Sequence, residues 1–273
     1  MRLIVSQHNV GVWAAYYLYK KITAFNPTAD KPFVLGLPTG STPLAMYEQL
    51  IKLHKNKLLS FKNVITFNMD EYVGLEATNP ESYHYYMYHN FFNHIDIEHK
   101  NINILDGMAA DLIQECQNFE QKITDLGGMD IIVGGIGEDG HLAFNEPSSS
   151  LASVTRVKTL NSSTVMANSR FFGHNIEKTP KLALTMGMKT IMDAKEVMML
   201  AKGMNKATAI AHTIEGAVSG LCPASFLQMH PKASIICDEY ATYELKVKTV
   251  RYFENICDEF DAIEKELIKA LVI

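Results

Sequence analysis

An apolar run that leads into a glycine-containing turn, Phe33-Val34-Leu35-Gly36-Leu37-Pro38-Thr39-Gly40-Ser41-Thr42-Pro43, gives the clearest indication of the fold. Its first five residues have the composition of a buried β-strand. From Pro43 to His54, apolar residues recur at three- and four-residue intervals, as in an amphipathic helix. Thr42 fits the N-cap of that helix and Pro43 its first position. A strand that passes through a tight turn into a helix is the repeating unit of an α/β sheet.

The same alternation continues along the chain. Short β-rich runs occur at 64–67, 102–105, 131–133, 197–200 and 234–237, and helical periodicity occurs at 10–25, 109–126, 206–217 and 252–271. We therefore predict a mainly parallel sheet covered by helices on both faces. In such a sheet, ligands bind beyond the carboxyl ends of the strands, so motifs directly after strands carry most weight.

The composition is that of one ordinary globular domain covering residues 1–273. The chain is 47% apolar and 20% charged, and no Pro/Gly/Ser-rich linker divides it. Its net charge is −5 and its basic residues form no run longer than a dipeptide, which argues against nucleic acid as a partner. Residues 1–10 have one basic residue and only a three-residue apolar stretch, so we expect neither a signal peptide nor a membrane anchor there. The four cysteines are widely spaced without a CxxC pair, which indicates reduced thiols and a cytoplasmic location: Cys116, Cys222, Cys237 and Cys257.

The turn after the first strand fits a phosphate site. Backbone N–H groups of Gly40, Ser41 and Thr42 precede a helix, where unpaired N–H groups and the helix dipole favour an anion. An ordinary strand-to-helix turn would use the same residue types. The turn lacks the lysine of a Walker loop, so a nucleoside triphosphate is not favoured.

Two adjacent acids end the next strand, in Phe67-Asn68-Met69-Asp70-Glu71-Tyr72. A carboxylate there can point into the crevice or can lie in a solvated loop. A free aspartate has a pKa of about 3.9, so Asp70 would need partial desolvation to take a proton from carbon at neutral pH.

The segment Gly134-Gly135-Ile136-Gly137-Glu138-Asp139-Gly140-His141-Leu142-Ala143-Phe144-Asn145-Glu146-Pro147 contains a literal GxGxxG after a strand. A nicotinamide cofactor is nevertheless disfavoured. Pro147 interrupts the helix that the dinucleotide fingerprint needs, and no acid follows between Glu146 and Glu177 to bind a ribose.

The same segment brings an imidazole close to two carboxylates. A free imidazole titrates near neutrality, so a histidine such as His141 can take and return a proton, and Asp139 or Glu146 can fix its tautomer. A metal site is the rival use of these side chains, but no second histidine has a metal-binding spacing to His141. A buried histidine bonded to the backbone is the structural alternative.

Two cations complete the candidate set. Arg170 lies among aromatic and small residues in Ala167-Asn168-Ser169-Arg170-Phe171-Phe172, and Lys206 stands at a predicted helix start after a strand. Arginine binds phosphate oxygens through two N–H groups and lysine as a point charge. A solvated surface charge is the alternative for each of them.

Taken in order, these motifs resemble the glucosamine-6-phosphate deaminase family across nearly the whole chain. The matching segments are LGLPTGSTP, TFNMDEYVGL, ESYHYYM, GGIGEDGHLAFNEPSSSLAS, ANSRFF and HPKASIICDE. The resemblance implies a modified doubly wound, Rossmann-like α/β fold. It also implies conversion of glucosamine 6-phosphate and water into fructose 6-phosphate and ammonium, with no metal or organic cofactor.

The resemblance further implies a role for each matching residue. His141 would open the pyranose ring, supported by Asp139 and Glu146, and Asp70 would move the proton between C2 and C1. The phosphate would be bound by Gly40, Ser41, Thr42, Arg170 and Lys206.

The resemblance also implies that the activity is regulated. Allosteric members of the family are homo-hexamers with an N-acetylglucosamine 6-phosphate site between subunits. The matching positions are Ser149, Arg156, Lys158, Thr159 and Tyr252. Residues from about 158 to 185 resemble the family's mobile lid.

Other functions remain possible at this point. A sugar-phosphate lactonase of the same superfamily would use the histidine of the GEDGHLA segment without enolisation, and Asp70 favours the deaminase over it. A sugar-phosphate sensor would bind without turnover, but no basic helix-turn-helix stretch precedes Phe33. A dehydrogenase is weakened by the missing ribose acid.

Overall fold

The computed structural model describes residues 1–256 and residue 263. Its main sheet has seven strands in the order β1-β10-β9-β6-β2-β3-β5, and every neighbouring pair is parallel. The predicted α/β fold is therefore confirmed. The strands are β1 (Arg2–Val5), β2 (Phe33–Leu37), β3 (Val64–Asn68), β5 (Ile102–Asn103), β6 (Ile131–Gly135), β9 (Val197–Ala201) and β10 (Ala233–Cys237).

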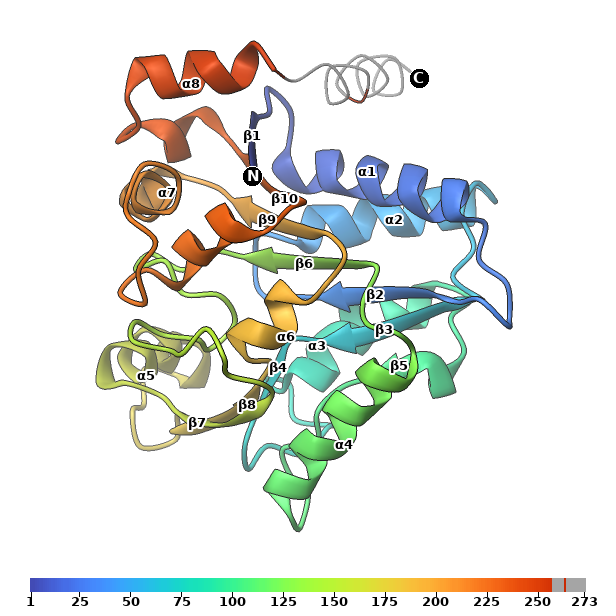
Figure 1. Ribbon diagram of the computed structural model, residues 1–273. Coiled ribbons are helices and arrows are strands. Elements are labelled where there is room, and N and C mark those ends of the chain that lie inside the picture. Colours follow the sequence, from blue (N-terminus) through green and yellow to red (C-terminus); the bar gives the residue numbers. More distant parts are fainter. Residues whose placement is uncertain (257–262, 264–273) are drawn as a thin grey trace.

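The strand order reverses at β2. From β2 the chain adds β3 and β5 on one side, then returns to place β6 on the other side and continues to β9 and β10. In Figure 1 the arrowheads of β2 and β6 point to the same side of the molecule. Because the strand order reverses between them, the connections after these two strands leave in opposite directions, and ligands of open α/β sheets bind at such a switch point.

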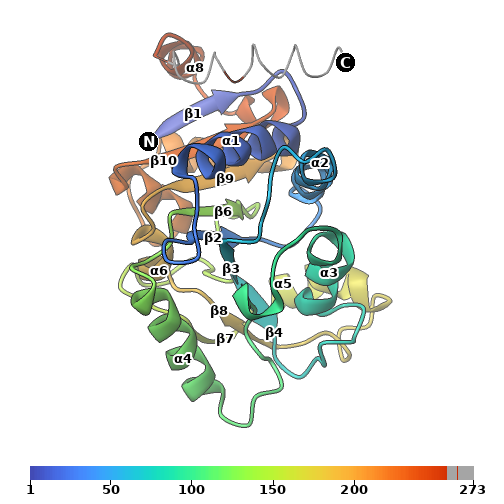
Figure 2. The same cartoon turned by 90° about the vertical axis from the view of Figure 1, so that its right-hand side faces the viewer.

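Helices cover both faces of the sheet, and Figure 2 shows α2 and α3 on one side with α4 and α6 on the other. Strand side chains alternate between the two cores: Leu35 and Met198 pack on the side of α1, α2 and α3, and Val34 and Met199 pack on the side of α4, α6, α7 and α8. Burying each such side chain stabilises the fold by about 2 kcal/mol. The helices are α1 (Val10–Phe25), α2 (Leu44–Lys55), α3 (Tyr83–Asn90), α4 (Leu112–Asp125), α5 (Ser162–Asn168), α6 (Met188–Met192), α7 (Ala207–Ile214) and α8 (Val247–Glu254).

A second, antiparallel sheet of three strands lies beyond β3. Its order is β4 (Asp70–Tyr72), β8 (Leu182–Thr185) and β7 (Arg156–Thr159). Asp70 pairs with Thr185, and Thr185 pairs with Arg156, so the three residues share one rung. The connection from β7 to β8 contains α5. Short 3₁₀ turns complete the described elements: Phe92–His94, His99–Asn101, Ser169–Phe172, Met204–Lys206, Pro223–Met229 and Glu239–Thr242.

Several helix boundaries differ from the predictions, among them the start of α4, which lies at Leu112 and not at residue 109. The predicted N-cap at Thr42 is wrong: Pro43 occupies that position without a side-chain hydrogen bond, and α2 begins at Leu44. Helix α7 ends at Ile214 because Glu215 leads into Gly216, and glycine commonly ends helices. Helix α8 covers only the start of the range predicted at 252–271. The remainder of that range, apart from residue 263, and Cys257 lie outside the described residues.

Candidate active site

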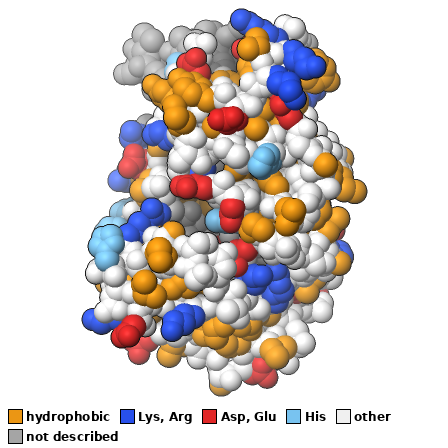
Figure 3. Space-filling model, turned by 90° about the vertical axis from the view of Figure 1, so that its left-hand side faces the viewer, with side chains coloured by type: hydrophobic (Ala, Val, Ile, Leu, Met, Phe, Trp, Pro, Cys, Tyr) orange, Lys and Arg blue, Asp and Glu red, His pale blue; other side chains and the backbone are white. Residues whose placement is uncertain are grey.

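The predicted site residues emerge from four neighbouring strands. Lys206 follows β9, Asp139 and His141 follow β6, the 40–42 turn follows β2, and Asp70 follows β3. Figure 3 looks onto the face where β2 and β6 end, and acidic, basic and histidine side chains mix across its middle. The fold therefore brings motifs from separate parts of the sequence to one edge of the sheet.

The turn after β2 is held by two phenol groups. Tyr47 donates to the carbonyl of Pro38 and Tyr86 donates to the carbonyl of Gly40, each at 2.5 Å. In a trans peptide the N–H points away from the C=O, so the two amides that follow these carbonyls face away from the phenols. Gly40 has φ +105°, a backbone conformation that is strained for any residue with a side chain. The turn is thus a fixed set of amide donors.

Asp70 is a buried carboxyl group. Its side chain is 8% exposed, and burial raises its pKa from 3.8 to about 8, with repulsion from Glu71 adding to the shift. The desolvation that the sequence required for a base at this position is therefore present. A carboxylate with such a pKa takes up a proton far more readily than a solvated one.

The neighbouring acid has a different role. Glu71 accepts backbone hydrogen bonds from Tyr72, Tyr83 and His84 at 2.8 to 3.0 Å, and the last two N–H groups belong to the first turn of α3. Burial raises the pKa of Glu71, and these N–H groups lower it by a smaller amount. Glu71 thus anchors α3 to β4, whereas Asp70 is not used in this way.

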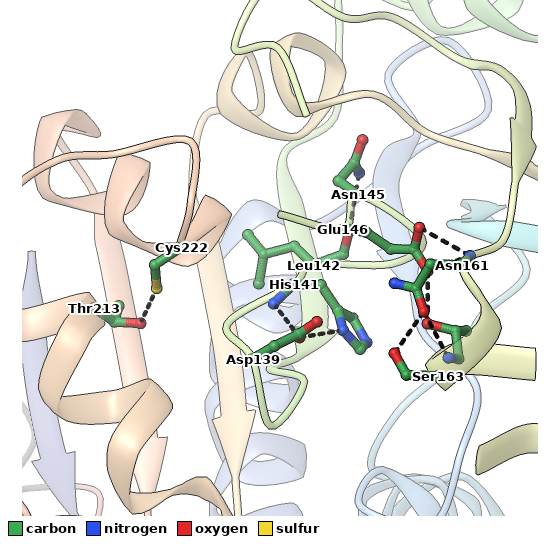
Figure 4. Close-up of polar contacts among 10 residues, drawn as sticks. Asp139, His141, Leu142, Asn145, Glu146, Asn161, Ser163, Thr213 and Cys222 are labelled. Atoms are coloured by element: carbon green, nitrogen blue, oxygen red, sulfur yellow. Dashed lines mark hydrogen bonds and ion pairs between the residues drawn. The ribbon is translucent and has the colours of Figure 1, made fainter. Parts of the chain in front are cut away.

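His141 and Asp139 form a close pair, shown in Figure 4. The imidazole Nδ1 lies 2.5 Å from Asp139 Oδ1, which also accepts the backbone N–H of His141 at 3.1 Å. The hydrogen bond from the imidazole lowers the pKa of Asp139. A hydrogen on Nδ1 leaves Nε2 free for the substrate. Gly137 is required beneath the ring, because a Cβ there would lie 2.2 Å from the imidazole.

Glu146 is buried and bonds to the segment predicted to be a lid. Its carboxylate accepts the backbone N–H of Asn161 at 3.1 Å and the hydroxyl of Thr164 at 2.6 Å, on the opposite side of His141 from Asp139 in Figure 4. The expectation that Glu146 polarises the imidazole stays a prediction. What the geometry adds is a direct tie between Glu146 and the start of α5.

The two predicted phosphate cations lie within electrostatic reach of each other. Burial lowers the pKa of Lys206, attraction to Glu138 and Asp139 opposes that change, and repulsion from Arg170 adds to it. Arg170 is exposed, and its guanidinium lies 4.8 Å from the ring centre of Phe171. The two cations come from different elements, so only the folded chain brings them together.

The predicted regulatory residues divide into two groups. Ser149, Arg156, Lys158 and Thr159 lie on β7 or in the segment that leads to it. Tyr252 lies on α8, is 60% exposed, and is at the opposite end of the molecule from β7 in both ribbon views. A single chain therefore does not assemble all five positions.

Among the described residues, no three His, Cys, Asp or Glu side chains are grouped as metal ligands. No helix in residues 1–256 is both long and apolar enough to cross a bilayer.

Residues 10–236 match the family model described as glucosamine-6-phosphate isomerases/6-phosphogluconolactonase. The chain belongs to this family. Among family members, a glucosamine-6-phosphate deaminase from Tolumonas auensis is 59% identical over 247 residues, which cover 90% of this chain and 93% of the relative. A protein of the same name from Treponema denticola is 59% identical over 258 residues, covering 94% and 96%. The predicted family and enzyme class are confirmed by these relatives.

Solved structures of the family agree with this fold. One, described as a monomeric glucosamine-6-phosphate deaminase, is 41% identical with a TM-score of 0.81 and covers 89% of this chain and all of its own. A 6-phosphogluconolactonase from Thermotoga maritima has a TM-score of 0.70 at 16% identity, covering 87% of this chain and 99% of its own. The second match supports the fold alone.

Sequence reasoning missed several residues that shape the site. Tyr86 lies in the ESYHYYM segment, but nothing in that pattern indicates contact with Gly40, which is 46 residues away. Nothing in the sequence distinguishes Tyr47 of α2 from an ordinary core residue. Only the predicted position of the turn at a helix start offered a signal, because phenols on neighbouring helices can reach such a turn.

Proposed function

We propose that the chain converts glucosamine 6-phosphate and water into fructose 6-phosphate and ammonium. The observation that carries this proposal is the buried Asp70, with a pKa near 8, at the end of β3 beside the turn of β2. Lactone hydrolysis needs one group that activates water. An aldose–ketose isomerisation needs a second group that moves a carbon-bound proton, and Asp70 fits that need.

The substrate phosphate would be bound by the turn and the two cations. The amides of Gly40, Ser41 and Thr42 offer neutral donors, while Arg170 and Lys206 offer positive charge. The fixed peptide orientation of the turn supports this assignment, since oriented donors bind an anion without reorganising.

Ring opening would use His141. Its free Nε2 takes the proton of the C1 hydroxyl and delivers it to the ring oxygen as the C1–O5 bond breaks, which leaves an aldehyde. Asp139 holds the imidazole by Nδ1 and stabilises its charged form. Glu146 lies beside this pair and would support it.

Isomerisation would use Asp70. The carboxylate takes the C2 proton while O1 gains one proton of the substrate's ammonium group, which gives an enolamine. The carboxylate then returns its proton to C1, which gives a protonated C2 imine. Water adds to that imine and ammonium leaves. Every proton and electron pair stays within the substrate, water and these side chains, so no cofactor is needed for the balance.

The deciding assay is ammonium release from glucosamine 6-phosphate by purified, metal-stripped protein, with fructose 6-phosphate measured in parallel. Equal amounts of both products would support the proposal. Hydrolysis of 6-phosphogluconolactone without ammonium release would favour the lactonase instead. Binding of the sugar phosphate with neither reaction would favour a sensor.

A mobile lid at about 158–185 is part of the proposal. Asn161 and Thr164 donate hydrogen bonds to the carboxylate of Glu146, and these bonds support a lid. They would hold the start of the segment in place only while the Glu146 side chain keeps this position. Amide hydrogen exchange across this segment should slow when fructose 6-phosphate binds. Unchanged exchange would count against a lid.

Allosteric activation, a homo-hexamer and a cytoplasmic location complete the proposal. Exposed Tyr252, remote from Arg156, supports a site completed by another subunit. One matched structure is described as monomeric, so light scattering must measure the subunit number directly. If N-acetylglucosamine 6-phosphate left the substrate saturation curve unchanged, activation would be excluded, and cell fractionation would test the location.

A further inference from the structure

The stretch from Gly140 to Ser148, which carries His141 and Glu146, is held at both ends by one other segment. That segment is Ser219–Ser225, which follows α7 and includes the first residues of the 3₁₀ turn Pro223–Met229. The N–H of Ala224 donates to the carbonyl of Gly140 at 2.8 Å, and the N–H of Ser148 donates to the carbonyl of Gly220 at 2.7 Å. These two bonds lie on either side of the proposed acid/base group.

Both residues held in this way have a left-handed backbone. Gly140 has φ +82° and Ser148 has φ +75°. A serine in this region is strained, and such a conformation persists only where its surroundings impose it. The hydrogen bond from the N–H of Ser148 to the carbonyl of Gly220 therefore holds the backbone at a residue that would otherwise relax to an unstrained conformation.

Side-chain packing fixes the first end further. A Cβ on Gly140 would lie 2.4 Å from the sulfur of Cys222, so the two residues are in tight contact. Cys222 is 6% exposed, and its sulfur lies 3.7 Å from the hydroxyl of Thr213 on α7. In Figure 4, Cys222 and Thr213 lie on one side of the loop that carries Asp139 and His141. Glu146 and Asn161 lie on the other side of that loop.

The holding segment is itself braced by one buried hydroxyl. Ser225 Oγ accepts the N–H of Ser219 at 2.8 Å and donates to the carbonyl of the same residue at 3.0 Å. Ser225 has no exposed surface. These two bonds close the segment into a ring, so the positions of Gly220 and Ala224 depend on a side chain that touches neither His141 nor Glu146.

We propose that Ser219–Ser225 sets the geometry of the proposed catalytic stretch, and that Ser225 and Cys222 are positioning residues for His141 and Glu146. This inference rests on the proposed function and adds the groups that keep its acid/base pair in place. A displacement of about 1 Å at a reacting group can lower a rate about 100-fold, so such bracing bears on turnover as well as on stability.

The test compares two buried serines. Ser225→Ala removes both bracing bonds, whereas Ser234→Ala on β10 removes a buried hydroxyl for which the described residues offer no hydrogen-bond partner. We expect Ser225→Ala to lower kcat about 10-fold with little change in KM, and Ser234→Ala to leave both unchanged. Equal effects of the two substitutions would overturn the inference.

A double-mutant cycle separates positioning from general destabilisation. If Ser225 acts through His141, Ser225→Ala causes no further loss in a His141→Gln background. Full additivity would mean that Ser225 does not act through the imidazole. Should Ser225→Ala fail to fold, Cys222→Ala with Cys116→Ala as its control replaces it, since Cys116 lies on α4 and is similarly buried.

Amide hydrogen exchange gives a readout that needs no turnover. The N–H of Ser148 is protected by Gly220, so its exchange should accelerate in Ser225→Ala and stay slow in Ser234→Ala. Absence of deaminase activity in the unmodified protein would refute the proposed function alone. Unchanged exchange at Ser148 would refute the positioning role, whatever the activity.

Discussion

Replacing Asp70 by asparagine should stabilise the protein while it abolishes turnover. The folded chain holds Asp70 with a pKa near 8, against about 3.9 in an unfolded chain. Folding therefore requires Asp70 to take up a proton, and between about pH 4 and pH 8 this uptake costs the folded state more with each step up in pH. The amide side chain of the variant is neutral at every pH and avoids this cost.

The size of the gain follows from the same two pKa values. Proton linkage gives about 4 kcal/mol at pH 7 and about 1 kcal/mol at pH 4.5 in favour of the Asp70→Asn variant. In a chain of this length, a gain of about 4 kcal/mol corresponds to a rise in Tm of about 10 °C. Calorimetry at both pH values measures the difference, and the gain should shrink as the pH falls.

Glu71→Gln is the matched control. Its carboxylate accepts three backbone N–H groups, and the new amide NH₂ would face at least one of them. This variant should lose about 1 to 3 kcal/mol. An Asp70→Asn variant that is less stable than the parent at pH 7, or whose gain does not vary with pH, would refute the assignment of Asp70 as a desolvated acid.

Three further outcomes are expected. Because only the ionised form of Asp70 takes a proton, kcat/KM should rise about tenfold per pH unit below pH 7 and level off above pH 8; a flat profile from pH 6 to 9 would exclude this base. His141→Gln should slow turnover of cyclic substrate about 100-fold or more yet recover partly with open-chain substrate, whereas Asp70→Asn should not recover; equal losses would contradict the division of roles. Tyr86→Phe should weaken binding of inorganic phosphate several-fold by calorimetry, and Tyr88→Phe on the same helix should not; indistinguishable affinities would show that the phenol does not orient the turn.

Elements whose apolar pattern extends over many residues could be predicted from the sequence. The predicted bounds of α1 and β2 agree with the structure, because sixteen residues of helical spacing and five buried apolar residues leave little alternative. Strands β1, β4, β7 and β8 were missed. They have three or four residues each, and β4 and β7 mix charged with apolar side chains, so neither alternation nor an apolar run marks them.

The candidate site was predictable in part. Glycines and charged residues that directly follow predicted strands indicated the 40–42 turn, His141 and Asp70 as candidates. Parallel strands bring their carboxyl ends to the same edge of a sheet, so such residues can meet there. The different roles of Asp70 and Glu71 were not predictable, because adjacent acids look alike until α3 places its N–H groups on one of them. The hydrogen bonds between the 140–148 stretch and Ser219–Ser225 were not predictable either, because they join segments that are far apart in the chain.

The rung shared by Asp70, Thr185 and Arg156 has a consequence for inhibitor design. Neighbouring strands are about 4.8 Å apart, so the backbone of Arg156 lies about 10 Å from that of the proposed base, across two ladders of hydrogen bonds. Paired strands shift together, so a compound wedged against β7 would tilt the carboxyl group of Asp70 without entering the crevice. Such a compound would lower turnover without competing with the sugar phosphate, and raising the substrate concentration would not displace it.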